Sequence, residues 1–172
     1  MKKFLTTTLL LAIVFTSMQA CAQAEDKSKR PSPPAQFTAS NNGTNITIDY
    51  SQPSLKGRAV GKEVAPYGEV WRTGANEATT FEVNRDVTVE GKTLKAGKYA
   101  LFTIPGQNEW TLIFNKQANQ WGAYEYKQAQ DALRVNVKPS KAENVSERMT
   151  FAQKGDKVAL LWGDTEVAFT VK

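Results

Sequence analysis

Short segments in which apolar and polar residues alternate recur along most of this chain, and turn-forming residues separate one segment from the next. The alternation is regular in residues 45–51 and 110–115. It has the period of a β-strand with one buried face, whereas an amphipathic helix repeats about every 3.6 residues. Turn residues such as those at 41–43 and 105–106 close the segments. The chain is therefore restricted to folds made of consecutive short strands.

The segments that carry this pattern are 45–51, 81–84, 87–89, 98–104, 110–115, 132–138, 148–153, 157–162 and 166–171, with a further short strand near 70–73. Residues 116–130 break the pattern and predict a short helical insertion. Residues 139–146 predict a polar connection, and Gly163 and Asp164 predict a turn. Roughly ten short strands at this spacing predict an all-β fold, either an antiparallel β-sandwich or a flattened barrel.

The N-terminal 20 residues have the pattern of a signal peptide. Lys2 and Lys3 precede an apolar run at 4–15, which is the order of regions in a secretory signal. The run is too short to cross a bilayer, since a spanning helix takes about 20 residues. We therefore expect residues 1–20 to be a signal peptide and the protein to be exported across the inner membrane.

Two processing patterns overlap at Cys21. Residues 18–21 resemble a lipobox, in which the cysteine becomes the lipidated first residue of a bacterial lipoprotein. Residues 20–22 and 22–24 instead fit the small-x-small rule of ordinary signal peptidase. Cys21 is thus either lipidated or removed. The protein is accordingly expected in the periplasm, or at the outer membrane or cell surface as a lipoprotein that touches the membrane only through its lipid.

The residues that follow predict a disordered tether at 21–35 and a single folded domain at 36–172. The tether is polar and rich in proline, a composition that cannot form a core. Residues 23–26 resemble the acidic tag that directs some bacterial lipoproteins to the cell surface, or they are an ordinary acidic part of the tether.

The composition excludes several functional classes. The chain has no histidine, and its one cysteine is Cys21, so the domain has no internal disulfide, no zinc-finger site and no Ser-His or Cys-His nucleophile. The formal net charge of +5 is too small and too dispersed to indicate a nucleic-acid partner. The acidic residues are scattered rather than clustered as in calcium loops, so we expect no metal and no cofactor, with a calcium or other oxygen-ligand site as the open alternative.

A polar and aromatic stretch at 67–80 is the first candidate for a ligand site. Glycines in this stretch favour a turn that displays side chains. Together with the loop before it, the stretch supplies the candidate ligand-binding residues Arg58, Tyr67, Trp71, Arg72, Asn76 and Glu77. The alternative is structural, in that Arg72 and Glu77 pair with each other or with Arg58 while Trp71 fills the core.

The insertion supplies a second group of aromatic residues. Trp121 and Tyr124, with Tyr126, are candidates for an aromatic platform that stacks sugar rings. The alternative is a small satellite cluster that packs the insertion onto the sandwich. Trp110 and Trp162 lie within strand patterns, and we expect both in the core.

An enzymatic role would need two carboxylates with different pKa values on either side of a scissile bond. Glu69 and Glu77 are the best-placed pair, with Asp49 as a further candidate. Their spacing does not distinguish them from ordinary surface acids. We therefore expect no catalytic residue and keep the enzyme class open.

Several long motifs resemble the DUF2911 family of exported bacterial proteins, which is common in Bacteroidota. They are YSQPSLKGR at 50–58, PYGEVWRTGANEAT at 66–79, AGKYALFTIPG at 96–106 and the segments 110–116 and 120–122. One departure is Gln52, where relatives tend to have arginine. The family is defined as a domain of unknown function, so the resemblance implies a compartment and a type of domain but no reaction.

Three functions follow as hypotheses. The first is an exported, non-catalytic β-sandwich domain that binds a small polar ligand or a glycan near Arg58, Trp71 and Glu77. The second is a structural or assembly partner of envelope proteins, which would present a flat apolar patch instead of a pocket. The third is a carboxylate-dependent hydrolase, which needs two acids about 5 to 10 Å apart across a cleft.

Overall fold

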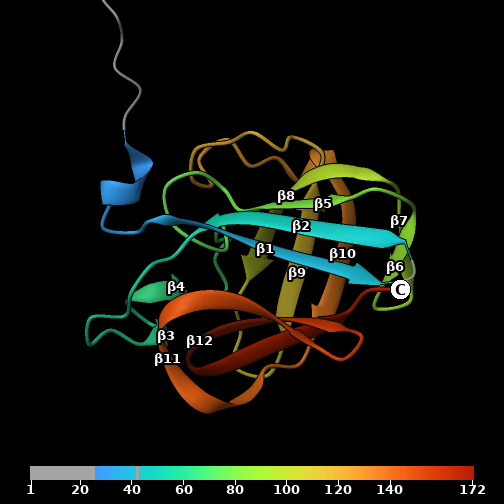
Figure 1. The fold of residues 1–172 in the computed structure, drawn as a ribbon. Coiled ribbons are helices and arrows are strands. Elements are labelled where there is room, and N and C mark those ends of the chain that lie inside the picture. The colour runs from blue at the N-terminus through green and yellow to red at the C-terminus, as the bar shows by residue number, and fades with distance from the viewer. Residues whose placement is uncertain (1–25, 42) are drawn as a thin grey trace, which may run out of the picture.

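The computed structural model describes residues 26–41 and 43–172, and these residues form mainly β-strands (Figure 1). The signal peptide expected at 1–20, the lipidation candidate Cys21 and the start of the tether lie outside the described residues. Within the described part, no helix is both long and apolar enough to cross a membrane.

One antiparallel sheet of six strands forms the first layer. Its strands, in spatial order, are β1 (Pro34–Asn41), β2 (Thr44–Ser51), β5 (Thr80–Val83), β8 (Gly97–Ile104), β9 (Trp110–Asn115) and β10 (Asp131–Val137). The register places Ile48 opposite Phe81, and Leu101 opposite Phe114. The period-two alternation thus aligns apolar residues across neighbouring strands, as cross-strand packing requires.

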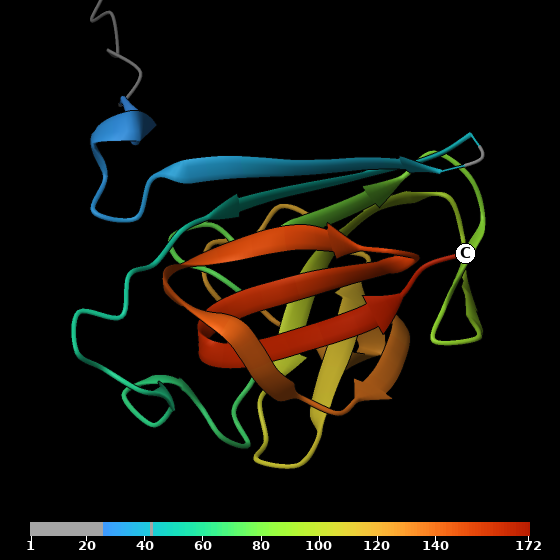
Figure 2. The ribbon, with the colours of Figure 1, turned by 60° about the horizontal axis from the view of Figure 1, so that its bottom comes forward.

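A long hairpin of β11 (Ser140–Lys154) and β12 (Lys157–Thr170) forms the second layer. The hairpin lies across one face of the six-stranded sheet (Figure 2). Apolar residues from both layers, including Phe81, Phe114 and Phe169, meet in one buried cluster between them. The architecture is sandwich-like, which confirms the all-β prediction. The six-stranded sheet stays open, with β1 and β10 at its edges.

The hairpin differs from the three short strands predicted between residues 148 and 171. The predicted polar connection at 139–146 belongs to β11, and the predicted turn at Gly163 lies inside β12. The pairing shifts register at Ser146 opposite Gly163. Gly163 has a φ of 62°, a conformation that glycine adopts without strain, so a β-bulge replaces the predicted turn and the strands continue.

The remaining elements are small. They are the two-stranded ribbons β3 (Val60–Gly61) with β4 (Val64–Pro66) and β6 (Val87–Val89) with β7 (Lys92–Leu94), and the 3₁₀ turn η2 (Gln128–Gln130). The helical insertion predicted at 116–130 is therefore reduced to η2. The strand predicted near 70–73 is a single bridge between Trp71 and Thr103.

The sheet buries apolar residues on both faces. Successive residues of β8 point to opposite sides, so Leu101 belongs to the main core between the layers and Phe102 belongs to a second cluster on the other face. Tyr126 of the insertion packs on Phe102 at a ring separation of 5.1 Å. The insertion thus covers the sheet face that the hairpin leaves open.

The N-terminal arm, which we define as residues 26–33, lies against the domain. It begins with the 3₁₀ turn η1 (Lys27–Lys29), whose first amide groups are capped by Asp26, and it runs directly into β1. We expected residues 21–35 to be a tether without structure. Its described part before β1, residues 26–33, contacts Glu77 in the loop before β5 through the basic side chains of Lys27 and Arg30.

Candidate functional site

The first half of the loop at 71–78 is built into the core. The Trp71 ring stacks on Trp162 at 5.5 Å and meets Trp110 edge-on at 6.3 Å. Its Nε1–H donates to the Gly74 carbonyl at 3.1 Å. The Thr73 hydroxyl, fully buried, bonds the Thr103 hydroxyl at 3.2 Å. These contacts confirm the prediction that Trp110 and Trp162 are core residues, and they place Trp71 with them.

The second half of the loop turns outward and is joined to the insertion. Asn76 has a φ of 59°, a left-handed conformation in which asparagine is enriched. The Gly122 amide donates to the Asn76 carbonyl at 3.0 Å, and the Ala78 amide donates to the Gln120 carbonyl at 2.9 Å. These bonds bridge Glu77 to Trp121. Residues 44 positions apart in the sequence are thereby held side by side on rigid backbone.

Two hollows share Glu77, Ala78 and Thr80 in their walls, and we call them together the Glu77 groove. The larger, of about 500 Å³, is also lined by Asp49, Ser51 and Lys98. The smaller, of about 380 Å³, is also lined by Gln120, Trp121 and Glu125. The Trp121 side chain remains 55% exposed at this position. A carboxylate and an indole thus stand together at a hollowed part of the surface.

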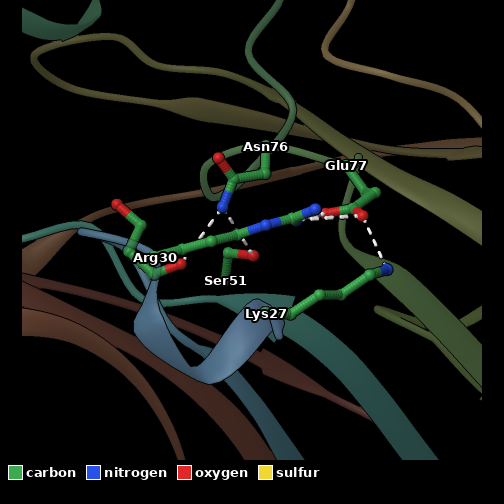
Figure 3. A network of polar contacts seen from close by, with 6 residues as sticks. Lys27, Arg30, Ser51, Asn76 and Glu77 are labelled. Carbon is green, nitrogen blue, oxygen red and sulfur yellow. Dashed lines mark hydrogen bonds and ion pairs between the residues drawn. The ribbon is translucent and has the colours of Figure 1, made fainter. Parts of the chain in front are cut away.

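The basic residues of the N-terminal arm bind the Glu77 carboxylate (Figure 3). Lys27 Nζ lies 2.8 Å from Glu77 Oε1. Arg30 Nη1 lies 2.9 Å from Oε2 and 3.1 Å from Oε1. The Arg30 guanidinium also lies over the Trp121 ring, 5.8 Å from its centroid, which is a cation–π geometry. The groove therefore already holds two cations of its own chain.

The arm is also held through its main chain. The Asn76 side-chain amide donates to the Ser32 carbonyl at 3.1 Å and to the Ser51 hydroxyl at 3.3 Å; Figure 3 shows Asn76 above Ser51. The Gln52 amide donates to the Pro33 carbonyl at 2.9 Å. The Gln52 side chain turns the other way and donates to the Met149 carbonyl. The loop at 71–78 thus binds the Ser32 carbonyl, and the Gln52 bond extends the β1–β2 pairing by one residue.

The electrostatics of the groove favour ionised carboxylates. Desolvation raises the pKa of Glu77, but hydrogen bonds from Lys27, from its own backbone amide and from Arg30 outweigh it, and the pKa falls to about 2. Desolvation likewise raises the pKa of Asp49, and hydrogen bonds from Gln36 and Lys98 lower it below its usual value. Both acids that line the larger hollow are therefore charged at neutral pH.

Of the predicted site residues, Glu77 and Trp121 line the groove, and Arg58, Tyr67 and Arg72 are among those that do not. Arg58 donates to the carbonyls of residues 54 and 55, each at 2.9 Å, and so closes its own loop. The Tyr67 ring lies directly against Gly61 and lines a separate hollow. The Nε of Arg72 is buried and has no hydrogen-bond partner among the described residues. Among the described residues, no ion pair joins Arg72 to Glu77. The Glu77 carboxylate pairs with Lys27 and Arg30 instead.

The predicted aromatic platform divides into two parts. Tyr126 belongs to the satellite cluster, and its hydroxyl donates to Asp131 at 2.7 Å. Burial, followed by that hydrogen bond, raises the pKa of Tyr126 to about 12. Tyr124 is 84% exposed. Its ring packs against Gly122, next to the Arg72 guanidinium. Trp121 and Tyr124 are the aromatic residues of the insertion that face solvent.

The acids proposed as a catalytic pair do not share a wall of the groove. Glu69 lines neither hollow, whereas Asp49 and Glu77 both line the larger one. Among residues 26–41 and 43–172, no group of three or more histidine, cysteine, aspartate or glutamate side chains is placed to hold a metal ion.

Sequence reasoning missed the basic residues Lys27 and Arg30 and the groove residues Ser51 and Gln120. The basic run at 27–30 stands out in the sequence, but a charge run in a polar segment is ordinarily solvated. Its partner Glu77 lies about 50 positions away, and no local pattern links the two. In the sequence, Ser51 was one of the polar residues that alternate with apolar ones in the predicted strand at 45–51, and nothing marked it as a site residue.

Comparison with known proteins gives a family. Neither the curated proteins nor the solved structures contain a significant match to this chain. A family described as "Protein of unknown function (DUF2911)" matches residues 32–171. Because this match covers most of the sequence and the whole of the sandwich, the chain belongs to the DUF2911 family, as its motifs predicted.

Proposed function

We propose that this protein is an exported, non-catalytic binding domain that holds a small polar ligand or a glycan in the Glu77 groove. One observation carries the proposal: the Glu77 carboxylate lies beside the exposed Trp121 indole where two hollows meet. A carboxylate accepts hydrogen bonds from hydroxyl or amino groups, and an indole face packs against the apolar side of a ring.

The dimensions and the rigidity of the groove support this function. Hollows of about 500 and 380 Å³ fall in the range of small-molecule sites, which is about 300 to 1,000 Å³. The backbone bonds from Ala78 and Gly122 hold the main chain of Glu77 and Trp121 in place before any ligand arrives. Such preorganisation lowers the entropic cost of binding.

The groove does not favour the hydrolase hypothesis. A glycosidase-like mechanism needs one carboxylic acid whose pKa is raised, so that it stays protonated and donates to the leaving group. The pKa values of Asp49 and Glu77 are both lowered. The assembly hypothesis is not favoured either, because the exposed Trp121 borders a charged hollow rather than a flat apolar patch.

For the compartment, we propose export directed by residues 1–20. The sequence of that segment supports this proposal, as does the lipobox-like pattern at Cys21. The mass of the mature protein from a bacterial host tests both. A lipid-bearing N-terminus at Cys21 that disappears in Cys21→Ser would assign a lipoprotein, and an unmodified N-terminus after position 22 or 24 would assign a free periplasmic protein.

A thermal-shift screen tests the binding function. The purified protein is screened against glycans, nucleotides and amino acids, and every hit is repeated on Glu77→Gln and on Trp121→Ala. We expect a ligand to raise the wild-type midpoint and to leave both variants unmoved. Glu69→Gln is the matched control, because the Glu69 side chain is exposed and lines neither hollow. A shift that survives Glu77→Gln would place the site elsewhere.

A further inference from the structure

The N-terminal arm meets the Glu77 groove as a ligand meets a site. We propose that the arm is a tethered occupant of the groove, and that the partner that displaces it is a basic peptide segment with an arginine or lysine on Glu77. This inference goes beyond the proposed function, because it places a different class of ligand, a peptide, in the same groove. The charge of Glu77, the Trp121 face and the bond from Asn76 to the Ser32 carbonyl each support it.

The side chains of the groove suit a guanidinium group. Arg30 is 12% exposed, and one of its terminal nitrogens contacts both oxygens of Glu77. Its carbon Cζ lies over the Trp121 ring. Charge from one side and a π-face from the other are the two features by which proteins select arginine. Lys27 adds an ammonium group at the more exposed side of the same carboxylate.

The main-chain contacts indicate a peptide rather than a small amine. Asn76 donates to the Ser32 carbonyl, and the Gln52 amide donates to the Pro33 carbonyl where the β1–β2 pairing continues beyond Pro34 and Ser51. Both donors bind backbone oxygen atoms, so they do not depend on the side chains of the arm. An extended peptide offers such carbonyls next to a basic side chain, whereas a free amine or a sugar does not. Main-chain pairing of this kind is a recurring mode of peptide recognition.

The arm is held weakly enough to be displaced. No residue of η1 is buried, and the Lys27 and Glu77 side chains are 55% and 39% exposed, so the Arg30 side chain, which is 12% exposed, makes the strongest of the side-chain contacts. Exposed ion pairs contribute about 0 to 1 kcal/mol, and single hydrogen bonds about 0.5 to 1.5 kcal/mol. The arm stays docked mainly because it is tethered, which gives it an effective concentration on the order of millimolar. An untethered peptide therefore competes with it.

Peptide binding to the full-length chain tests the inference. The probe is a fluorescein-labelled peptide with the sequence of residues 26–33, DKSKRPSP, and binding is read from its anisotropy. We expect the Lys27→Ala, Arg30→Ala variant to bind the probe at least about tenfold more tightly than wild type, because its own arm no longer competes. Adding Glu77→Gln to this variant should abolish binding, as should replacing the probe residues that correspond to Lys27 and Arg30 with alanine.

A matched control removes the same number of charges elsewhere. Lys29→Ala with Lys62→Ala serves, because Lys29 pairs with Asp26 inside the arm and Lys62 is exposed on a distant turn. This control should bind the probe as wild type does. Equal affinity of wild type and the arm variant would overturn the inference, and so would binding that survives Glu77→Gln.

Wild-type protein gives the same test if a variant fails to fold. Unlabelled peptide at millimolar concentration should shift the indole N–H resonance of Trp121 and leave that of the buried Trp110 in place. A Glu77-dependent sugar or nucleotide with no peptide binding would overturn the inference and leave the proposed function intact. Peptide binding with no small-ligand binding would support the inference and overturn the proposed small-ligand function. If neither a small ligand nor the peptide binds in a Glu77-dependent way, both proposals are overturned.

Discussion

The loop at 71–78 has two halves that are adjacent in sequence and opposite in character. In the first half, the Trp71 indole lies between two other tryptophans and Thr73 is buried. In the second half, Asn76 and Glu77 are partly exposed and bind the N-terminal arm. The first half is held by packing against the sandwich, and the second by polar contacts with two separate segments of the chain.

This difference teaches that residue type alone does not assign a role. Trp71 and Trp121 are the same residue, and both stand in glycine-containing loops. Trp71 is fixed by its neighbours from β9 and β12, whereas Trp121 meets solvent on the opposite side of the sheet. What separates core from site is the layer that each loop faces. Substitutions in the two halves should therefore have different consequences.

The largest expected effect is on the packed half. Trp71→Ala should lower the free energy of unfolding by about 3 kcal/mol, because it removes a partly buried indole that packs on Trp110 and Trp162 and leaves a cavity. Trp121→Ala is the matched control and should cost less than about 1 kcal/mol, since its side chain is 55% exposed. Urea unfolding measures both. Equal losses would mean that the two halves are equally structural.

A smaller effect is expected from the buried hydroxyl pair. Thr73→Val removes the bond to Thr103 at 3.2 Å and leaves the Thr103 hydroxyl without that partner, at a cost of about 1 to 3 kcal/mol. If the hydroxyl pair is the cause, the double variant with Thr103→Val should cost less than the sum of the two single variants. Simple additivity in urea unfolding would assign the loss to backbone strain at Thr73 instead.

The strands show how far local pattern determines this fold. The predicted strand at 110–115 has the bounds of β9, and that at 45–51 lies within β2, because alternation and turn residues act over a few positions. The conformation at Gly163 was harder to predict, because glycine is equally common in a turn and in a β-bulge. Only the pairing with Ser146 across the hairpin selects the bulge, and that pairing is a tertiary contact.

The candidate site was predictable in part, for a related reason. The stretch around Asn76 and Glu77 stood out because polar groups between glycines indicate display on a turn. The partners of Glu77 come from residues 27, 30 and 121, and no spacing rule connects positions so far apart. The polar composition of the arm predicts that it forms no core of its own, and composition carries no information on where the arm docks.

On the exposed half, Asn76→Asp should release the arm with little loss of global stability. The substitution replaces an N–H donor with a carboxylate oxygen that faces the Ser32 carbonyl, so attraction becomes repulsion. We expect a change of less than about 1 kcal/mol in unfolding free energy, together with faster amide exchange at Gln52. Asn84→Asp makes the same chemical change at the far end of the sheet and should leave Gln52 protected.

The smallest effect is the pH dependence of arm docking. The pKa of Glu77 is lowered from 4.5 to about 2 in the folded protein, so its ion pairs stabilise the folded state above pH 4.5 and lose that contribution as the pH falls toward 2. Solvent screening of this 39% exposed side chain limits the contribution to less than about 1 kcal/mol. The difference in unfolding free energy between wild type and Glu77→Gln should therefore shrink over this window, while that between wild type and Glu69→Gln stays near zero. A difference that is constant from pH 7 to pH 2.5 would show that Glu77 does not hold the arm by charge.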